Sequence, residues 1–237
     1  MIPKIIHYCW FGRGEKPQLA KKCIESWKKF CPDFEIKEWN EDNYDVKSHP
    51  YTEFCYNNKK WAFLSDFVRL DVVERFGGIY LDTDVEMVRS FEPLLQFHAF
   101  YGFENERYIA TGLGFGAEPG HMTVSALKKE YECFESQDSL VQLTGCPVLN
   151  TNALLEFGLL RNGCCQRVGE AEIFPVEYFN PYEDSTGKLN VTENTFSIHW
   201  YAKSALPTSA KIRSRLTRPF HRAFGKDCFK KIKSKEK

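Results

Sequence analysis

The sequence lacks the features of several protein classes. No apolar run approaches the ~20 residues that a membrane-spanning helix needs, and there is no internal repeat or low-complexity tract. No linker-like stretch divides the 237 residues, of which 43% are hydrophobic. A chain of this length and composition can bury a sizeable core, and we expect one α/β domain for most of it.

Nine cysteines are present, but their arrangement favours neither disulfides nor a zinc site. The number is odd, no secretory signal is recognisable in Met1–Lys4, and no two cysteines form a Cys-x-x-Cys pair. Secreted proteins use disulfides, whereas cytosolic proteins keep thiols reduced. We therefore expect reduced thiols in a cytoplasmic protein.

The net charge is zero, but the charge is unevenly distributed. Residues 203–237 contain twelve Lys or Arg and two acids, a charge of +10, which leaves −10 on residues 1–202. Apolar residues recur in this segment at near-helical spacing, with an interruption at Pro219. These residues are Ile212, Leu216, Phe220, Phe224, Phe229 and Ile232.

A basic segment with an apolar face predicts contact with an anionic membrane surface. Residues 206–237 are therefore expected to form a C-terminal tail and residues 1–205 the main domain. A solvated tail and a tail docked on the acidic body are the alternatives. Nucleic acid is disfavoured as a partner because the rest of the chain is acidic.

Two carboxylates mark the most informative stretch of the chain. Asp82 and Asp84 follow the β-prone run Ile79–Leu81, which comes after the Gly77–Gly78 pair. If the strand continues through Val85, both carboxylates point to the same side. Side by side they repel each other unless a cation lies between them. The pattern predicts a divalent metal site at the carboxyl end of a strand, where open α/β sheets bind ligands.

A helix is predicted ahead of this strand. Apolar residues recur at helical spacing from Trp61 to Phe76, and Gly77 supplies a stop. Asp66 and Arg69 lie three residues apart and so share one helix face. An ordinary surface ion pair would have the same spacing, and an isolated Asp-x-Asp pattern is common. Together, however, helix, turn and strand would bring the two acids and Arg69 into one site.

These residues resemble a known family. Ser65-Asp66-x-x-Arg69, followed by Gly77-Gly78-Ile79-Tyr80-x-Asp82-x-Asp84, is similar to the core of glycosyltransferase family 32, whose members contain an Asp-x-Asp motif. The opening Ile2–Gly12 is similar to that family's first strand and donor loop, and the resemblance covers roughly residues 1–120. It implies a GT-A-type fold, with a Rossmann-like central mixed sheet flanked by helices.

The resemblance also implies an activity. It is retaining transfer of a hexose from a nucleotide-diphosphate sugar, a UDP- or GDP-hexose, to a hydroxyl of a glycan acceptor, with Mn²⁺ or Mg²⁺ as cofactor. Capsule, exopolysaccharide or lipopolysaccharide synthesis is the expected setting. The acceptor would then be lipid-linked, and the protein would lie peripherally on the cytoplasmic face of the inner membrane.

Individual roles follow from the same resemblance. Trp10 would stack on the base, and His7, Ser65 and Tyr80 would belong to the nucleotide-sugar pocket. Asp66 and Arg69 would hold the hydroxyls of the donor sugar, and with Asp82 they form the expected catalytic set. Asp82 and Asp84 would ligate the metal, which would neutralise the charge that develops on the diphosphate.

A third element is expected from the far end of the chain. His199, after a β-prone segment, could complete the metal shell, and Lys203 and Ser204 could contact phosphate. A buried, hydrogen-bonded histidine beside Trp200 is an equal alternative. A carboxylate nucleophile is not assigned: Glu104 and Glu106 are the nearest candidates in sequence order, but a surface-loop position is favoured for both.

The remaining elements are read more coarsely. Strands are expected at residues 97–103 and 109–117, and helices at residues 122–134 and from about 146 to 160. Asn150 and Asn152 follow a Gly-Cys-Pro turn and are weak candidates for the acceptor side.

Two rival functions share parts of the pattern. Haloacid-dehalogenase-like phosphatases use the first Asp of Asp-x-Asp as a nucleophile, which would be Asp82. A non-catalytic carbohydrate-binding protein would not need Arg69, Tyr80 and a metal pair beside an aromatic base platform. A transferase would release free nucleotide from a nucleotide sugar, and this release would distinguish it from the phosphatase and from the carbohydrate-binding protein.

Overall fold

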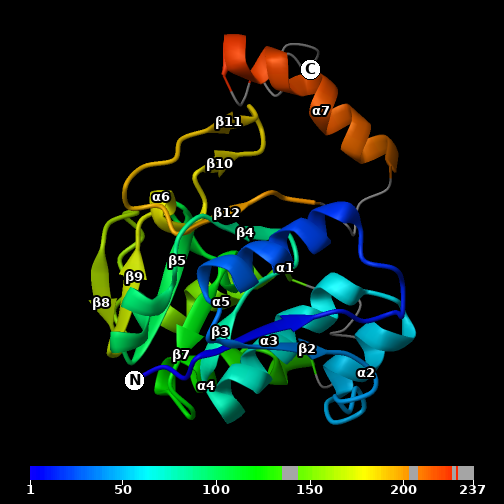
Figure 1. Cartoon of the computed structure of the whole chain (residues 1–237), viewed down its shortest axis with the longest axis vertical. Helices are drawn as coiled ribbons and strands as arrows, with labels where there is room; N and C mark the ends of the chain where they lie inside the picture. The colour runs from blue at the N-terminus through cyan, green and yellow to red at the C-terminus, as the bar shows by residue number, and fades with distance from the viewer. Residues whose placement is uncertain (135–143, 203–207, 226–227, 229–237) are drawn as a thin grey trace.

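A mixed β-sheet forms the centre of the protein, described here by a computed structural model over residues 1–134, 144–202, 208–225 and 228 (Figure 1). The strand order is β2 (Glu35–Trp39), β1 (Ile5–Cys9), β3 (Gly78–Tyr80), β7 (Phe115–Ala117), β5 (Ala99–Asn105), β9 (Ala171–Phe174) and β8 (Gln166–Val168), with β6 (Tyr108–Ile109) paired to β5. Strand β1 runs parallel to β2 and β3, whereas β7 is antiparallel to both β3 and β5.

Helices cover both faces of this sheet and confirm the predicted α/β class (Figure 1). The helices of the described residues are α1 (Gln18–Phe30), α2 (Pro50–Asn57), α3 (Trp61–Phe76), α4 (Met122–Lys129), α5 (Cys146–Leu155), α6 (Val176–Phe179) and, apart from the sheet, α7 (Thr208–Phe224), with short 3₁₀ turns η1 (Glu92–Gln96), η2 (Thr111–Leu113) and η3 (Glu132–Phe134). Two small pairs complete the described fold: β4 (Val85–Met87) with β12 (Ser197–His199), and β10 (Tyr182–Glu183) with β11 (Lys188–Leu189).

The sheet separates two hydrophobic cores. Successive residues of a strand face opposite sides, so Ile6 and Tyr8 of β1 pack with α1, while Cys9 packs with α3. Helix α1 contributes Trp27, and α3 contributes Leu64, each without exposed surface. Helix α3 is buried along most of its length, which holds its polar residues firmly in place.

Several sequence-based boundaries were wrong. The strand after Gly77 ends at Tyr80, and Asp82 and Asp84 lie in a turn closed by the Val85 N–H, which donates to the Asp82 carbonyl at 3.0 Å. Val85 starts a separate strand because β4 pairs with β12 rather than with the central sheet. The alternation of a single strand therefore does not orient the two carboxylates.

Other predicted elements are broken in a similar way. The strand predicted over residues 109–117 is split into β6, η2 and β7. The helix predicted to reach residue 134 ends at Lys129, and the one predicted to reach residue 160 ends at Leu155. Pro219, predicted to interrupt the tail, lies inside α7.

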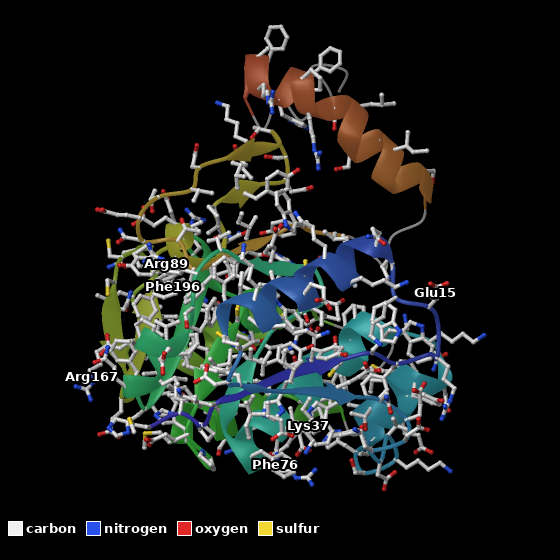
Figure 2. The ribbon with its side chains drawn as sticks, in the orientation of Figure 1. Glu15, Lys37, Phe76, Arg89, Arg167 and Phe196 are labelled. Carbon is white, nitrogen blue, oxygen red and sulfur yellow. The ribbon has the colours of Figure 1, made fainter. Side chains whose placement is uncertain are left out.

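Specific contacts fix the turn that carries the two acids. The Trp27 indole N–H donates to the Val85 carbonyl at 2.8 Å, and the Ser26 hydroxyl accepts from the Met87 N–H at 2.9 Å. The Arg89 guanidinium lies 5.1 Å from the centre of the Phe196 ring, just before β12 (Figure 2). Helix α1 and the chain before β12 thus hold β4 from two sides.

A similar contact braces the first strands. Lys37 of β2 lies 4.7 Å from the ring centre of Phe76, the last residue of α3, and both are labelled in Figure 2. The charged end stays near solvent while its stem covers apolar surface. The strand edge and the helix end are thereby tied together.

Helix α7 lies outside the sheet and its covering helices, next to β10 and β11 (Figure 1). The Arg218 guanidinium pairs with the Asp184 carboxylate at 2.9 Å, and Arg222 donates to the Thr186 carbonyl at 2.7 Å. None of the helices in the described ranges combines the length and apolar character that a membrane crossing requires.

Candidate active site

A cavity of about 400 Å³ opens where β1 and β3 end. The loop after β1, helix α3, the turn before β4 and the end of β12 all contribute to it. Open α/β sheets bind ligands at the carboxyl ends of their parallel strands, and this cavity lies at such an edge. Trp10, Ser65, Asp66, Arg69, Tyr80, Asp82, Asp84 and His199 line it, all of them predicted site residues.

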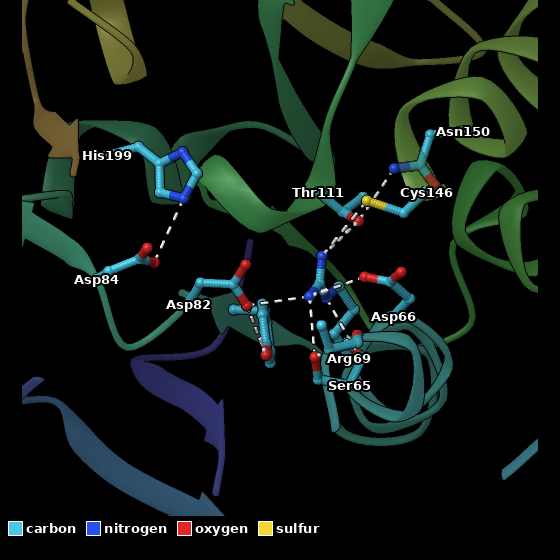
Figure 3. Close-up of polar contacts among 11 residues, drawn as sticks. Ser65, Asp66, Arg69, Asp82, Asp84, Thr111, Cys146, Asn150 and His199 are labelled. Atoms are coloured by element: carbon cyan, nitrogen blue, oxygen red, sulfur yellow. Dashed lines mark hydrogen bonds and ion pairs between the residues drawn. The ribbon is translucent and has the colours of Figure 1, made fainter. Parts of the chain in front are cut away.

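The Arg69 guanidinium is the centre of the polar network in this cavity (Figure 3). It is 2% exposed, and its Nη2 lies 3.0 Å from the carboxylate oxygens of both Asp66 and Asp82. Nη2 also donates to the Ser65 hydroxyl at 3.2 Å. A buried cation must be paired and hydrogen-bonded. The helical spacing of Ser65, Asp66 and Arg69 supplies two of these partners, and the turn after β3 supplies the third.

Tyr80 and Arg69 together orient Asp82. The Tyr80 hydroxyl donates to Asp82 Oδ1 at 3.0 Å, and the Arg69 guanidinium carbon lies 4.9 Å from the Tyr80 ring centre. Oδ1 receives hydrogen bonds from both Tyr80 and Arg69, and Oδ2 lies beside Gly112, which also lines the cavity. A Cβ on Gly112 would lie 2.5 Å from Oδ2, so only glycine leaves this space open.

Sequence analysis missed part of the support for Arg69. Its Nη1 lies 3.4 Å from the Thr111 hydroxyl and 3.7 Å from the Cys146 sulfur. Asn150 donates to the same hydroxyl at 3.0 Å. These residues come from η2 and α5, so only the fold brings them to Arg69. Asn150 thus lies beside the site, whereas Asn152 is exposed on the same helix.

Asp84 and His199 form the second half of the polar site (Figure 3). His199 Nε2 lies 3.3 Å from Asp84 Oδ1, and the Ala202 N–H donates to Asp84 Oδ2 at 2.7 Å. His199 reaches this position because β12 pairs with β4, with His199 opposite Val85. The expected third element therefore does come from the far end of the chain.

Asp82, Asp84 and His199 fit a divalent cation. Each offers one ligand atom, and these atoms lie within 4.8 Å of one another. The His199 Nδ1 is buried and has no hydrogen-bond partner among the described residues. Two carboxylates and an imidazole suit Mn²⁺ or a similar ion, while Mg²⁺ prefers oxygen ligands and water.

Burial and neighbouring charges separate the pKa values of the carboxylates. Burial, with the charge of Asp82, raises the pKa of Asp66 to about 6 against the opposing effect of Arg69. Burial likewise raises the pKa of Asp82. Burial would also raise the pKa of Asp84, but the charge and hydrogen bond of His199 and the Ala202 N–H hold it below its usual value. Asp84 is therefore the carboxylate best kept ionised for a cation.

The loop after β1 provides an aromatic wall. Trp10 lines the cavity, and its indole N–H donates to the Gly14 carbonyl at 2.7 Å. The backbone at Gly12 has a φ of 90°, and a Cβ there would lie 2.8 Å from the Trp61 ring. The glycine lets the loop fold close against Trp61, which also lines the cavity.

His7 is not in this cavity. Its side chain is fully buried, its Nε2 bonds to the Gly77 carbonyl at 2.8 Å, and its Nδ1 accepts from the Trp39 indole at 3.0 Å. The alternation along β1 turns it toward the turn after α3, so the fold does not bring it to this cavity, and its role in binding the nucleotide sugar stays a prediction. Lys203 and Ser204 lie outside the described residues, as do residues 229–237 of the tail.

Glu104 differs from the sequence-based interpretation as well. It is half-buried at the end of β5 and lines the cavity, and burial raises its pKa. It is therefore not a surface loop residue. Glu106 is exposed and does not line this cavity.

Residues 17–101 match the family described as the glycosyltransferase sugar-binding region containing the DXD motif. The matched stretch includes Asp66, Arg69 and both acids of the Asp-x-Asp motif. The chain is similar to inositol phosphoceramide mannosyltransferase 3 of Schizosaccharomyces pombe, with 32% identity over 42% of this chain and 29% of that protein. Mannosyl phosphorylinositol ceramide synthase SUR1 of Saccharomyces cerevisiae is 27% identical over 42% of this chain and 27% of its own length.

The chain thus spans less than a third of the length of these two relatives. A solved glycosyltransferase involved in the glycosylation of the major capsid of PBCV-1 aligns with 91% of this chain and 98% of its own, with a TM-score of 0.51 and 11% identity. That likeness shows the fold, which is the glycosyltransferase fold expected from the sequence.

Proposed function

We propose that this protein is a metal-dependent glycosyltransferase that moves a hexose from a nucleotide-diphosphate sugar to a hydroxyl group of a glycan. One observation carries the proposal: the clustering of Asp82, Asp84 and His199 ligand atoms within 4.8 Å, in the same cavity as the buried Arg69 network. The diphosphate of the donor is negatively charged and needs a cation, and the sugar needs carboxylates held in fixed positions to accept hydrogen bonds from its hydroxyls.

Different residues of the cavity would contact different parts of the donor. The Trp10 ring offers a flat face for a nucleobase. Asp66 and Arg69 provide an acceptor and a donor of hydrogen bonds for sugar hydroxyls, held 3.0 Å apart by their own ion pair. Asp82, Asp84 and His199 would hold the ion, which supplies positive charge to the departing diphosphate. The rigid network means that little reorganisation is needed when the donor binds.

The printed names of two relatives refer to mannosyl transfer. We take mannose as the first sugar to test, on either UDP or GDP. Retention of the anomeric configuration, a role in capsule, exopolysaccharide or lipopolysaccharide synthesis and a cytoplasmic location stay predictions.

The rival functions fit the site less well. A phosphatase would use the Asp82 carboxylate as its nucleophile, but the hydrogen bonds that Oδ1 receives from Arg69 and Tyr80 make this carboxylate a weaker nucleophile. A carbohydrate-binding protein has no need for His199, which reaches Asp84 from the far end of the chain. Both rivals stay open to the same experiment.

The test is hydrolysis of a panel of UDP- and GDP-hexoses with and without Mn²⁺, comparing wild type with Asp84→Asn. We expect one donor to be turned over with Mn²⁺ and Asp84→Asn to lower turnover by roughly 100-fold or more. Asp33→Asn is the matched control, because Asp33 is exposed and pairs with Lys4 away from the cavity. Absence of binding and turnover for every donor would contradict the proposal, and a phosphoryl-Asp82 adduct would favour the phosphatase.

We propose further that α7 belongs to a C-terminal tail separate from the domain of residues 1–205, and that it binds the protein to an anionic membrane. Ile212, Leu216 and Phe224 are 52, 67 and 73% exposed on this helix. Arg218 and Arg222 bond to the loop between β10 and β11, which supports docking of the helix on the body as well. One side of α7 would then face lipid while the other holds the body nearby.

A further inference from the structure

A second groove adjoins the donor cavity. It has a volume of about 1310 Å³ and is bordered by the end of β5, the residues after α6, strand β10 and Tyr201. Glu104 lines both the cavity and the groove. A molecule in the groove would therefore meet a donor sugar at Glu104.

Asn180 supplies an unused hydrogen-bond acceptor in this groove. It is 6% exposed and lines the groove, and its Nδ2 donates to the Glu104 carbonyl at 2.9 Å and to the Tyr201 hydroxyl at 2.6 Å. Its Oδ1 has no partner among the described residues. A buried acceptor without a partner loses the hydrogen bonds that water would give it, which destabilises the fold. A hydroxyl-bearing ligand would restore a hydrogen bond to it.

Tyr201 forms the wall between the two sites. Its backbone has a φ of 50°, a conformation that non-glycine residues rarely adopt. Its ring centre lies 4.2 Å from that of His199. Strained residues persist where the surrounding structure fixes them, often at functional sites. Here the strained backbone places the Tyr201 ring against His199, and it places the Tyr201 hydroxyl where it accepts a hydrogen bond from Asn180.

The charge of the groove restricts its ligand. Five of the described lining residues are carboxylates, Glu104, Glu106, Glu177, Glu183 and Asp184, and one, Arg107, is basic. Asp184 is paired with Arg218, and Glu177 accepts from Asn194. The remaining acidic character repels phosphate and uronate groups, while carboxylates and amides suit the hydroxyls of a neutral sugar.

We propose that this groove is the acceptor site and that it takes the end of an uncharged, hydroxyl-rich saccharide, with Glu104 orienting the attacking hydroxyl by accepting its hydrogen bond. This inference rests on the proposed transferase function. In the transfer, the acceptor oxygen bonds to the anomeric carbon while the bond from that carbon to the diphosphate oxygen breaks. The hydroxyl proton leaves with the diphosphate. Asn180 binds a second hydroxyl of the acceptor and positions Glu104.

The test compares matched disaccharides that end in a hexose or in the corresponding hexuronic acid, with the donor found in the hydrolysis panel. We expect kcat/KM to be at least 10-fold higher for the neutral acceptor. Glu106→Arg should lower the ratio of kcat/KM for the neutral acceptor to kcat/KM for the acidic acceptor by at least threefold. Glu106 is exposed on the groove wall, so the substitution replaces a charge that repels the acidic acceptor with one that attracts it. The control Glu25→Arg, on the outer face of α1, should leave the ratio unchanged.

A second variant addresses the amide. Asn180→Leu should raise the acceptor KM by at least 10-fold while the donor KD, measured by calorimetry, changes less than twofold. Equal use of both acceptors, or an unchanged ratio in Glu106→Arg, would overturn the inference. Donor hydrolysis without transfer to any neutral disaccharide would also overturn it and leave the proposed function standing. If wild type binds no donor, both fail.

Discussion

At the scale of single residues, Arg69 decides how the site is built. It is buried among Asp66, Asp82 and Ser65, so the carboxylates that we propose to bind the donor are fixed before any ligand arrives. Removal of one member of a buried ion network leaves an uncompensated charge. The same residues therefore serve the stability of the fold and the geometry of the cavity.

Gly112 tests the importance of space beside Asp82. In Gly112→Ala, the new Cβ would lie 2.5 Å from Asp82 Oδ2 and 3.2 Å from Arg69 Nη1, so the carboxylate has to move. Displacement of about 1 Å can cost roughly 100-fold in rate. We expect kcat/KM for donor hydrolysis to fall by roughly 10- to 100-fold, while the thermal unfolding midpoint changes little.

Gly145→Ala is the control for that substitution. Among the described residues, the added Cβ would meet only Pro147 Cδ at 3.7 Å, an ordinary contact, and Gly145 does not line the cavity. Normal kinetics in Gly112→Ala, with the substitution verified, would show that Asp82 does not need its observed position.

At the scale of elements, the proposed metal-binding set of Asp82, Asp84 and His199 depends on how β4 pairs. The sequence motif supplies Asp82 and Asp84, but the chain leaves the sheet after Tyr80 and β4 pairs with β12. Only this pairing brings His199 to Asp84. The Trp27 indole and Ser26 hydroxyl of α1 hold β4 in place. Local sequence cannot specify such a pairing, because the two strands are more than 100 residues apart.

His7 ties three elements together and makes their packing sensitive to pH. The Trp39 indole can only donate and the Gly77 carbonyl can only accept, so the ring must be neutral, with its proton on Nε2. Burial lowers the pKa of His7 to about 4, from an ordinary value of 6.5. In the unfolded chain the ring takes up a proton near pH 6.5, so acid favours unfolding.

The stability that depends on His7 is fully present above pH 6.5 and is lost as the pH falls toward 4. At about 1.4 kcal/mol per pH unit, this loss amounts to roughly 3 kcal/mol. Urea unfolding between pH 7 and 4.5 should show a smaller pH dependence in His7→Gln, because the amide keeps a donor and an acceptor but does not titrate. His98→Gln, at an exposed site, is the control. An unchanged slope in His7→Gln would refute this account.

At the scale of the whole molecule, the described part of the tail is a helix beside an acidic body. Leu216 and Phe224 expose their side chains on α7, while Arg218 is occupied by Asp184. Full burial of such an apolar side chain contributes about 1.5–3 kcal/mol. Membrane contact would therefore draw on the apolar residues as well as on positive charge.

The membrane proposal predicts that wild type binds vesicles containing anionic lipid and that Leu216→Glu with Phe224→Glu lowers the partition coefficient by at least roughly 10-fold. The binding should weaken with added salt, because part of it is electrostatic. Leu160→Glu, at a site 63% exposed on the body, is the control. Equal sedimentation of wild type and the double variant with vesicles, or no binding by either, would contradict the proposal.

The sequence by itself determined the parts of this protein that depend on local pattern. Helical spacing placed Ser65, Asp66 and Arg69 on one face, and the glycine pair set the turn before β3. These features follow from backbone geometry and the period of apolar residues, which operate over a few residues. The motif that they form lies in the stretch that matches the glycosyltransferase sugar-binding region.

Only the tertiary structure decided which distant residues join that motif. It placed His199 at Asp84, brought Thr111 and Asn150 to Arg69, and turned His7 away into the core. The physical reason is that strand pairing and packing between elements are fixed by the whole core, so contacts across the chain leave no periodic signal in the residues themselves.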